Sequence, residues 1–339
     1  MGRFLIRFLL FILPLAGLAG AGGYWWLNQP LVIKPPAVGP SGDLSVDLSI
    51  EPGTSARGVA QAVADAGVQV NPTLLYGWFR LSRQDRQIKA GSYELAQGAT
   101  PRTLLQKLVR GEEALRAVTL VEGWTFAQMR EELLKSEQLK HDTQALEASV
   151  IMQKLGRPGV AAEGRFFPDT YTYAKGSSDL AVLKRAARAM DKKLDAVWSL
   201  RAADSPLKTP EQALILASIV EKETGKGSDR PQIAGVFTNR MRIGMPLQTD
   251  PTVIYGMGAK FDGNLRKRDL QTDTPWNTYT RRGLPPTPIA MPGKSALLAA
   301  VQPAQTKALY FVARGDGSSQ FSATLDEHNR AVNKFQRGQ

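Results

Sequence analysis

The strongest constraint on how this 339-residue chain can fold is an apolar stretch close to its N-terminus. Arg3 and Arg7 precede this stretch, which runs from Phe8 to Trp26 without a charged residue. A run of this length suits one bilayer-spanning helix, and arginines on its N-terminal side favour a cytoplasmic N-terminus. We therefore expect residues 1–7 in the cytoplasm, a transmembrane helix over residues 8–27, and the rest of the chain outside the cytoplasm.

A cleaved signal peptide is the competing interpretation of the same residues. The small residues from Ala19 to Gly23 form a segment that a signal peptidase can accept. Tyr24, Trp25 and Trp26, however, form an aromatic belt that is typical of a membrane–water interface, and this favours retention of the helix. Both interpretations export the remainder of the chain.

The exported part is predicted to contain a linker and two folded regions of overall α+β class. Residues 28–43 are rich in proline and glycine, a composition typical of a semi-extended linker. A small α/β module is expected over residues 44–117, beginning with an alternating strand at Leu44–Ile50. Helix N-caps then predict three helices, which begin after Thr54 or Ser55, after Asn71 and after Thr100.

A larger mixed α+β domain is expected over residues 118–339. Its predicted elements are a strand at Val118–Val121, a helix opened by Thr125, an amphipathic helix from Leu180 to Val197, a helix opened by Thr209 and Pro210, a hairpin around Gly315–Gly317, and a last helix with a capping box of Thr324 and Glu327.

The composition narrows the kinds of partner and of chemistry. Lys and Arg number 43 against 31 Asp and Glu, and the net charge of +12 favours an anionic partner such as acidic lipid or a carboxylate-bearing polymer. The alternative is that this charge only keeps the protein soluble. Neither zinc-finger spacing nor an RNA-binding aromatic motif occurs, so nucleic acid is not expected as a partner.

Few catalytic groups other than carboxylates are available. The chain has no cysteine and only two histidines, His141 and His328. This excludes disulfides, thiolate metal sites, a cysteine nucleophile and a histidine-rich metal site.

Glu221 is the candidate catalytic acid. It follows Leu214–Val220, a segment that is apolar except for Ser218 and therefore predicts a buried helix. Desolvation at the end of such a helix raises the pKa of a carboxyl group, as a general acid requires near neutral pH. The alternative is an ordinary helix-end glutamate close to Lys222 and Lys226.

Glu223 is expected to have a different role. Two residues correspond to about 200° around a helix, so the two glutamates are expected not to face one cleft. Glu221 shares its face with the small residues Ala217 and Ser218, which would leave room for a groove. Glu223 is interpreted as a structural carboxylate paired with a nearby Arg or Lys.

Two later segments resemble the wall of a carbohydrate cleft. The segments TNRMRIGMPLQTDPTVIYGMG and TPWNTYTRRGLPPTPIAMPG lack helix or strand periodicity over most of their length. Sugars are bound by planar amides, carboxylates and aromatic faces, so we expect substrate contacts from Gln248, Asp250, Tyr255, Asn277 and Tyr279. The alternative is a pair of rigid surface loops without a ligand. The upstream segment EGRFFPDTY adds Glu163 as a further candidate, or forms a buried turn.

Several of these segments, together with ASIVEKET, closely resemble the YceG-like (MltG) family of endolytic murein transglycosylases. The resemblance extends from the N-terminal anchor to the final helix. It implies a single transmembrane anchor in the bacterial inner membrane, a LysM-like module over residues 44–117 and a periplasmic catalytic domain over residues 118–339. It also implies one catalytic glutamate in the VEKET motif, here Glu221, and partnership with penicillin-binding proteins.

The implied reaction is endolytic cleavage of the bond between N-acetylmuramic acid and N-acetylglucosamine in nascent peptidoglycan strands, which would terminate glycan elongation. Glu221 would protonate the glycosidic oxygen and then accept the proton of the muramic acid 6-hydroxyl, which closes a 1,6-anhydro ring. The sugar supplies the nucleophile, so neither a metal nor a cofactor is required. The alternatives are a non-catalytic peptidoglycan-binding protein and a membrane-tethered scaffold of the wall-synthesis machinery.

Overall fold

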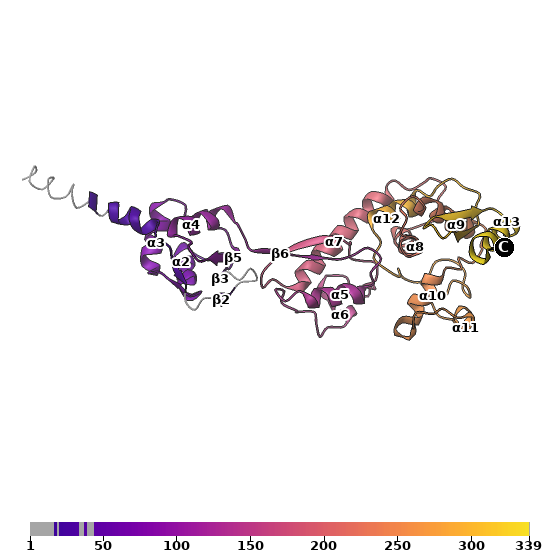
Figure 1. Ribbon diagram of the computed structural model, residues 1–339, viewed down its shortest axis with the longest axis horizontal. Helices are drawn as coiled ribbons and strands as arrows, with labels where there is room; N and C mark the ends of the chain where they lie inside the picture. The colour runs from indigo at the N-terminus through magenta and orange to yellow at the C-terminus, as the bar shows by residue number, and fades with distance from the viewer. Residues whose placement is uncertain (1–16, 19, 34–36, 39–43, 339) are drawn as a thin grey trace, which may run out of the picture. The chain divides into compact units, whose positions relative to one another are not determined.

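The computed structural model describes residues 17–18, 20–33, 37–38 and 44–338 (Figure 1). The chain divides into two compact units, Met1–Arg116 with Ala174–Gly176, and Ala117–Tyr173 with Ser177–Gln339. Both are mixtures of helices and small sheets, so the predicted α+β class is confirmed. Within the described ranges, no helix combines the length and the apolar character needed to cross a bilayer. Half of the predicted anchor, residues 8–16 and 19, lies outside those ranges, and residues 20–27 are helical.

The first unit is built around a three-stranded antiparallel sheet. β3 (Leu44–Ile50) lies between β2 (Ala37–Val38) and β5 (Gly91–Ala96), with Leu48 opposite Tyr93. The predicted N-caps Ser55, Asn71 and Thr100 all cap helices, which are α2 (Ala56–Asp65), α3 (Pro72–Leu81) and α4 (Pro101–Arg110). Their apolar faces share one core with the inner face of the sheet.

Part of the predicted linker belongs to this unit. β1 (Val32–Ile33) pairs with β4 (Val68–Gln69), and β2 pairs with β3. Leu31 is buried, and its N–H donates to the carbonyl of Ala99. Where a semi-extended linker was predicted over residues 28–43, these stretches are strands of the first unit, because backbone pairing with later strands orders them despite the neighbouring prolines.

The first half of the second unit packs around the long helix α7 (Asp179–Trp198). β6 (Leu115–Thr119) and β7 (Thr170–Ala174) form a two-stranded sheet, with β6 beginning three residues earlier than predicted. Helices α5 (Phe126–Lys135) and α6 (Ala148–Lys154) share a core with the N-terminal half of α7.

The second half of this unit contains the glutamate-bearing helix α8 (Pro210–Glu223). It packs against α7, α9 (Arg230–Arg242), α10 (Asp250–Met257) and α12 (Lys294–Val301). The 3₁₀ turn η1 (Gly258–Lys260) and α11 (Lys267–Gln271) follow α10. The chain ends with the predicted hairpin of β8 (Tyr310–Ala313) and β9 (Ser319–Ser322), α13 (Leu325–Val332) with its predicted capping box, and the π-helical turn η2 (Asn333–Arg337) (Figure 1).

The segment expected to be a long loop after α8 is partly helical. It contains the end of α9 and the whole of α10, whereas residues 275–293 are irregular as predicted. α9 lacks a simple apolar stripe because it buries polar as well as apolar residues, including Thr238 and Arg240. This burial of polar residues removes the periodicity by which a helix is recognised in sequence.

Candidate functional site

The two glutamates of the VEKET motif lie at the C-terminal end of α8. Thr209 caps the helix by accepting from the N–H of Gln212 at 3.2 Å, and Pro210 occupies its first turn. The eight residues from Ala213 to Val220 are all buried, as the apolar run predicted. The helix ends at Glu223, so burial of its body brings both carboxyl groups to one end of the core.

Glu221 is enclosed and fully bonded. Its Oε1 accepts from Arg230 Nη2 at 2.6 Å, and its Oε2 accepts from the N–H of Gly293 at 2.9 Å. Only 4% of the Glu221 side chain and 11% of the Arg230 side chain are exposed. Burial raises the pKa of Glu221, and the Gly293 N–H and the Arg230 guanidinium oppose that rise. The carboxylate thus joins the end of α8 to the first residue of α9 and to the N-cap of α12.

The face of α8 before Glu221 is packed and offers no groove. Ala217 and Ser218 are completely buried. The Ser218 hydroxyl donates to the carbonyl of Ile215 at 2.7 Å and accepts from the N–H of Ile289 at 3.0 Å. The expectation of a groove beside these small residues is wrong, because the loop before α12 fills that space.

Glu223 lines an open cavity of about 390 Å³. Three of the predicted sugar-binding residues line the same cavity: Gln248, Asp250 and Tyr279. Burial raises the pKa of Glu223 to about 7; the negative charge of Asp250 adds to the rise, while the Thr249 hydroxyl bond and the Arg240 charge oppose it. A carboxyl group with this pKa is partly protonated at neutral pH, which is the state that general-acid catalysis uses.

The wall opposite α8 is held by a cluster of buried hydroxyls. The Thr249 hydroxyl donates to Glu223 Oε1, and the Thr249 N–H donates to Thr278 Oγ1 at 3.1 Å. Gln248 stands just before this cluster with a φ of +49°, and its N–H donates to the Thr278 carbonyl at 3.1 Å. A non-glycine residue in this left-handed region is uncommon and needs support from its surroundings. These bonds hold the backbone at Gln248, whose exposed side chain lines the cavity.

Asp250 and Tyr279 form a second polar pair in this cavity. The Tyr279 hydroxyl donates to Asp250 Oδ1 at 2.5 Å. Asp250 itself is exposed, and it is the second carboxylate that lines the cavity beside Glu223. The cavity therefore contains two carboxyl groups, those of Glu223 and Asp250.

Both glutamates also border a smaller hollow of about 340 Å³. Its lining combines the end of α8 with residues that precede and open α5, among them Glu122, Trp124 and Gln128. The prediction that Glu221 and Glu223 cannot border one cleft is therefore wrong. Two residues 200° apart diverge on the side of a helix, but at its last turn both reach the same exposed end.

Glu163 and Tyr255 bind each other. Glu163 is 8% exposed; it accepts from the Phe126 N–H at 3.0 Å and from the Tyr255 hydroxyl at 3.2 Å. Burial raises its pKa to about 7. Tyr255 also packs edge-on against Trp276, with ring centroids 5.5 Å apart. Neither residue lines the Glu223 cavity, so the expected direct contact of both with one glycan site is not supported.

Asn277 orders the loop and is not exposed to a ligand. It is completely buried; its amide donates to the carbonyls of Leu270 and Thr272 at 3.0 and 2.7 Å and accepts from the Tyr279 N–H at 2.8 Å. The expectation that Asn277 binds sugar directly is wrong, because its hydrogen-bonding groups are already used. It acts instead on the position of Tyr279.

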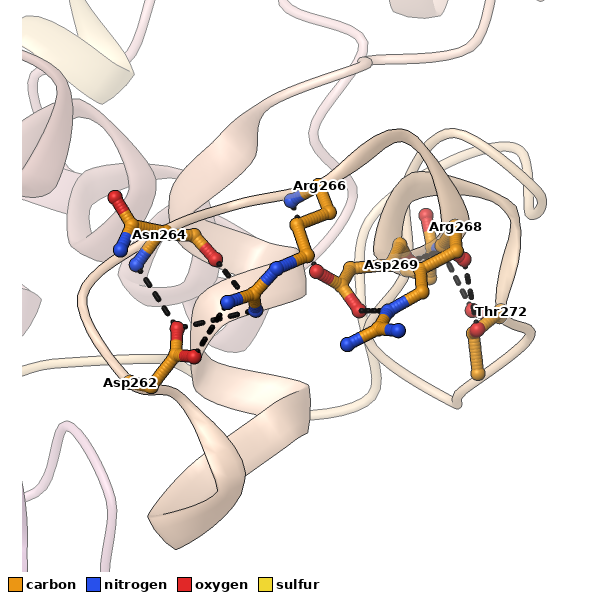
Figure 2. A network of polar contacts seen from close by, with 7 residues as sticks. Asp262, Asn264, Arg266, Arg268, Asp269 and Thr272 are labelled. Carbon is orange, nitrogen blue, oxygen red and sulfur yellow. Dashed lines mark hydrogen bonds and ion pairs between the residues drawn. The ribbon is translucent and has the colours of Figure 1, made fainter.

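The carbonyls that bind Asn277 belong to α11 and the residue after it, a segment with its own polar network (Figure 2). Arg266 pairs with Asp262 at 2.6 Å, and its N–H donates to Asp269 Oδ2 at 2.8 Å. The Thr272 hydroxyl donates to the Arg268 carbonyl at 2.8 Å. These bonds hold a very short helix in place for Asn277.

Besides Glu223, five cavity residues were not predicted as site residues from the sequence: Arg240, Tyr310, Phe311, Leu325 and His328. Tyr310 and His328 come from β8 and α13, far along the chain from α8. The scarcity of histidine was the one available signal for His328. Among the described residues, no three acidic or histidine side chains are grouped so that they could hold a metal ion.

The model of the YceG-like family matches residues 48–334 of the chain, which covers all the elements of this site. The chain belongs to the YceG-like family. The resemblance seen in the sequence motifs is therefore confirmed, and the VEKET segment lies inside the matched region.

Curated relatives and a solved structure agree with this membership. An endolytic murein transglycosylase of Bacillus subtilis is 29% identical over 86% of this chain and 85% of its own length. One from Streptococcus pneumoniae is 27% identical over 97% of this chain; the chain spans only 64% of that relative. A crystal structure of a YceG-like protein from Listeria monocytogenes is 27% identical, with a TM-score of 0.53 over 85% of this chain and 99% of its own.

Proposed function

We propose that this YceG-like protein is an endolytic murein transglycosylase, which cuts the glycan strands of bacterial peptidoglycan internally. Membership of the YceG-like family and the murein transglycosylase activity of its named relatives support peptidoglycan as the substrate class. The observation that supports acid catalysis is the position of Glu223, whose carboxyl group has a pKa of about 7. It lines a cavity together with Gln248, Asp250 and Tyr279. This combination provides a proton donor next to groups suited to sugar hydroxyls.

Glu223 is a better candidate for the acid than Glu221. Both oxygens of Glu221 are bonded, one of them to a guanidinium, and its side chain is 4% exposed. A proton donor must reach the glycosidic oxygen, and an enclosed carboxylate in an ion pair cannot do so without breaking that pair. Both glutamates border the smaller hollow, but only Glu223 lines the larger cavity, and it has one hydroxyl donor, Thr249.

The proposed reaction uses Glu223 twice. Its protonated carboxyl group donates to the oxygen that links N-acetylmuramic acid to N-acetylglucosamine, and the bond to the muramic acid C1 breaks. The carboxylate then accepts the proton of the muramic acid 6-hydroxyl, whose oxygen bonds to C1 and closes a 1,6-anhydro ring. The acid ends in its starting state, and no water is consumed.

A muramidase is the second candidate, and Asp250 is the observation that favours it. Glycosidases that hydrolyse the bond use two carboxyl groups, one as the acid and the other as base or nucleophile. Asp250 lines the same cavity as Glu223 and is held by Tyr279. In a hydrolase Asp250 would activate water and the product would have a reducing end.

The finer features implied by the resemblance complete the proposal. Residues 8–27 would anchor the chain in the inner membrane with residues 44–339 on the periplasmic side, as the apolar run and Arg3 and Arg7 indicate. Residues 44–117 would act as a LysM-like glycan-binding module, and penicillin-binding proteins would supply nascent strands. Cleavage of such strands would end their elongation.

The experiment is a muropeptide analysis of purified sacculi digested with the full-length protein in detergent. Wild type is expected to release products with anhydro ends, and Glu223→Gln is expected to release none. Glu221→Gln should retain cleavage at a temperature where it is folded. Glu131→Gln is the matched control, because that glutamate is 68% exposed on α5.

The products distinguish the candidates. Reducing ends from wild type would identify a hydrolase, and Asp250→Asn should then be inactive. Sacculi that are bound but yield no product with any variant would indicate a non-catalytic wall-binding protein. Activity in Glu223→Gln that is lost in a folded Glu221→Gln would return the role of the acid to Glu221.

A further inference from the structure

One cationic side chain in the Glu223 cavity has no role in the proton transfer described above. Arg240 is only 7% exposed, yet it lines the cavity. Its Nε donates to the Leu309 carbonyl at 2.7 Å and its Nη1 to the Leu247 carbonyl at 2.6 Å. These bonds fix the plane of the guanidinium and leave Nη2 without a hydrogen-bond partner among the described residues.

The two nearly buried arginines of this region differ in their counter-charge. Arg230 pairs with Glu221 at 2.6 Å. Among the described residues Arg240 forms no ion pair with a carboxylate, although its charge acts on Glu223; its guanidinium lies 5.4 Å from the centroid of the Tyr310 ring. A guanidinium withheld from water without a carboxylate is costly, and an anionic ligand would relieve that cost.

The same wall carries a second polar atom without a partner. His328 stacks on Tyr310, the same ring that Arg240 contacts, with ring centroids 5.3 Å apart. Its Nδ1 is buried without a hydrogen-bond partner, although the residue lines the cavity. Burial and the charge of Arg240 lower the pKa of His328, so its ring is neutral at pH 7 and can donate one N–H.

We propose that Arg240, with His328 beside it, forms a carboxylate-binding subsite that holds an acidic group of the glycan substrate next to Glu223. The inference rests on the proposed function, because it assumes that a wall glycan occupies this cavity. Peptidoglycan carries carboxylates on the lactyl group of muramic acid when the stem peptide is absent and on the peptide when it is present. A fixed guanidinium recognises either one by charge-assisted hydrogen bonds.

The subsite is tested by equilibrium binding of three oligosaccharides of equal length to full-length protein carrying Glu223→Gln. The ligands are a stem-free muramoyl oligosaccharide, a peptide-bearing one and a chitooligosaccharide, which has no carboxylate. We expect the acidic ligands to bind at least about tenfold more tightly than the chitooligosaccharide, and Arg240→Gln to remove this difference. His328→Phe should weaken the acidic ligands by a smaller factor.

Arg240→Gln also removes two hydrogen bonds to backbone carbonyls and could disturb the cavity itself. A second measurement therefore keeps Arg240 in place and follows how ligand affinity depends on salt. Affinity for the acidic ligands should fall with added NaCl, while affinity for the chitooligosaccharide stays constant. The relative affinity of the two muramoyl ligands identifies which carboxylate is bound. Equal binding of all three ligands, or equal weakening of all three by Arg240→Gln with no salt effect, would overturn the proposal. Cleavage by the Glu223→Gln protein would contradict the proposed acid but leave the binding comparison intact.

Discussion

The enclosed position of Glu221 predicts a structural effect that separates it from the proposed acid. Glu221→Ala removes one member of an ion pair whose side chains are 4% and 11% exposed. Loss of this partner leaves the nearly buried Arg230 with only the half-exposed Glu122, 4.0 Å away, as a counter-charge, which costs about 3 kcal/mol of unfolding free energy. The Gly293 N–H loses its acceptor as well. Glu221→Gln keeps a neutral acceptor, so its cost should be smaller, about 1–3 kcal/mol.

The assay is urea unfolding of the full chain in detergent, followed by tryptophan fluorescence, with the free energy taken from the midpoint at constant slope. Arg230→Met and the double variant Glu221→Ala/Arg230→Met complete a cycle. We expect the double variant to cost less than the two single costs combined, with a coupling above about 1 kcal/mol. Glu131→Ala, which removes an exposed glutamate from α5, should cost below about 1 kcal/mol.

A cost below about 1 kcal/mol for Glu221→Ala, equal to that of the exposed control, would refute this account. It would mean that the pair contributes no more than a surface ion pair. Glu221 would then be free to act on the substrate, and its role would have to be assigned again by the muropeptide assay.

Three other predictions follow from the same region. Glu223 must be protonated to donate and its pKa is about 7, so kcat/KM should fall about tenfold per pH unit above pH 7. Asp250→Asn removes a negative charge that raises the pKa of Glu223, so this variant should show the fall at lower pH. A pH profile that does not move would contradict the assignment of Glu223 as the acid. Burial raises the pKa of Glu163 in the folded state from 4.5 to about 7, so its contribution to the free energy of unfolding is full below pH 4.5 and is lost as the pH rises through 7. Glu163→Gln should therefore reduce the difference in unfolding free energy between pH 5 and pH 8. An unchanged difference would count against the burial of Glu163. Asn277→Ala removes three hydrogen bonds of a buried side chain, so it should lower the free energy of unfolding in urea by about 2–4 kcal/mol and loosen the loop that holds Tyr279. Limited proteolysis of this loop at the wild-type rate would argue against this role.

Local signals in the sequence were sufficient for much of the fold. Ser55, Asn71, Thr100, Thr125 and Thr324 all cap the helices that they predicted, because an N-cap acts on N–H groups within three residues. The apolar run before Glu221 likewise predicted a buried helix. Where the periodicity was weak, in α9 to α11, the helices were missed, because their burial depends on neighbours far along the chain.

Some features of the site were likewise predictable from local sequence, and others depended on the tertiary structure. Sequence motifs alone predicted the family and the cavity residues Gln248, Asp250 and Tyr279. They assigned an ion pair with Arg or Lys to Glu223, but the observed ion pair is that of Glu221 with Arg230. Only the tertiary structure distinguished Glu221, whose two oxygens are bonded to Arg230 and Gly293, from Glu223, which lines the larger cavity. The two glutamates are separated by a single residue and have nearly the same local sequence, so the difference in their hydrogen-bond partners and access is set by groups from α9, α12 and the start of α10. Such contacts form only when the chain is folded, whereas helix caps and apolar runs act between neighbours in the sequence.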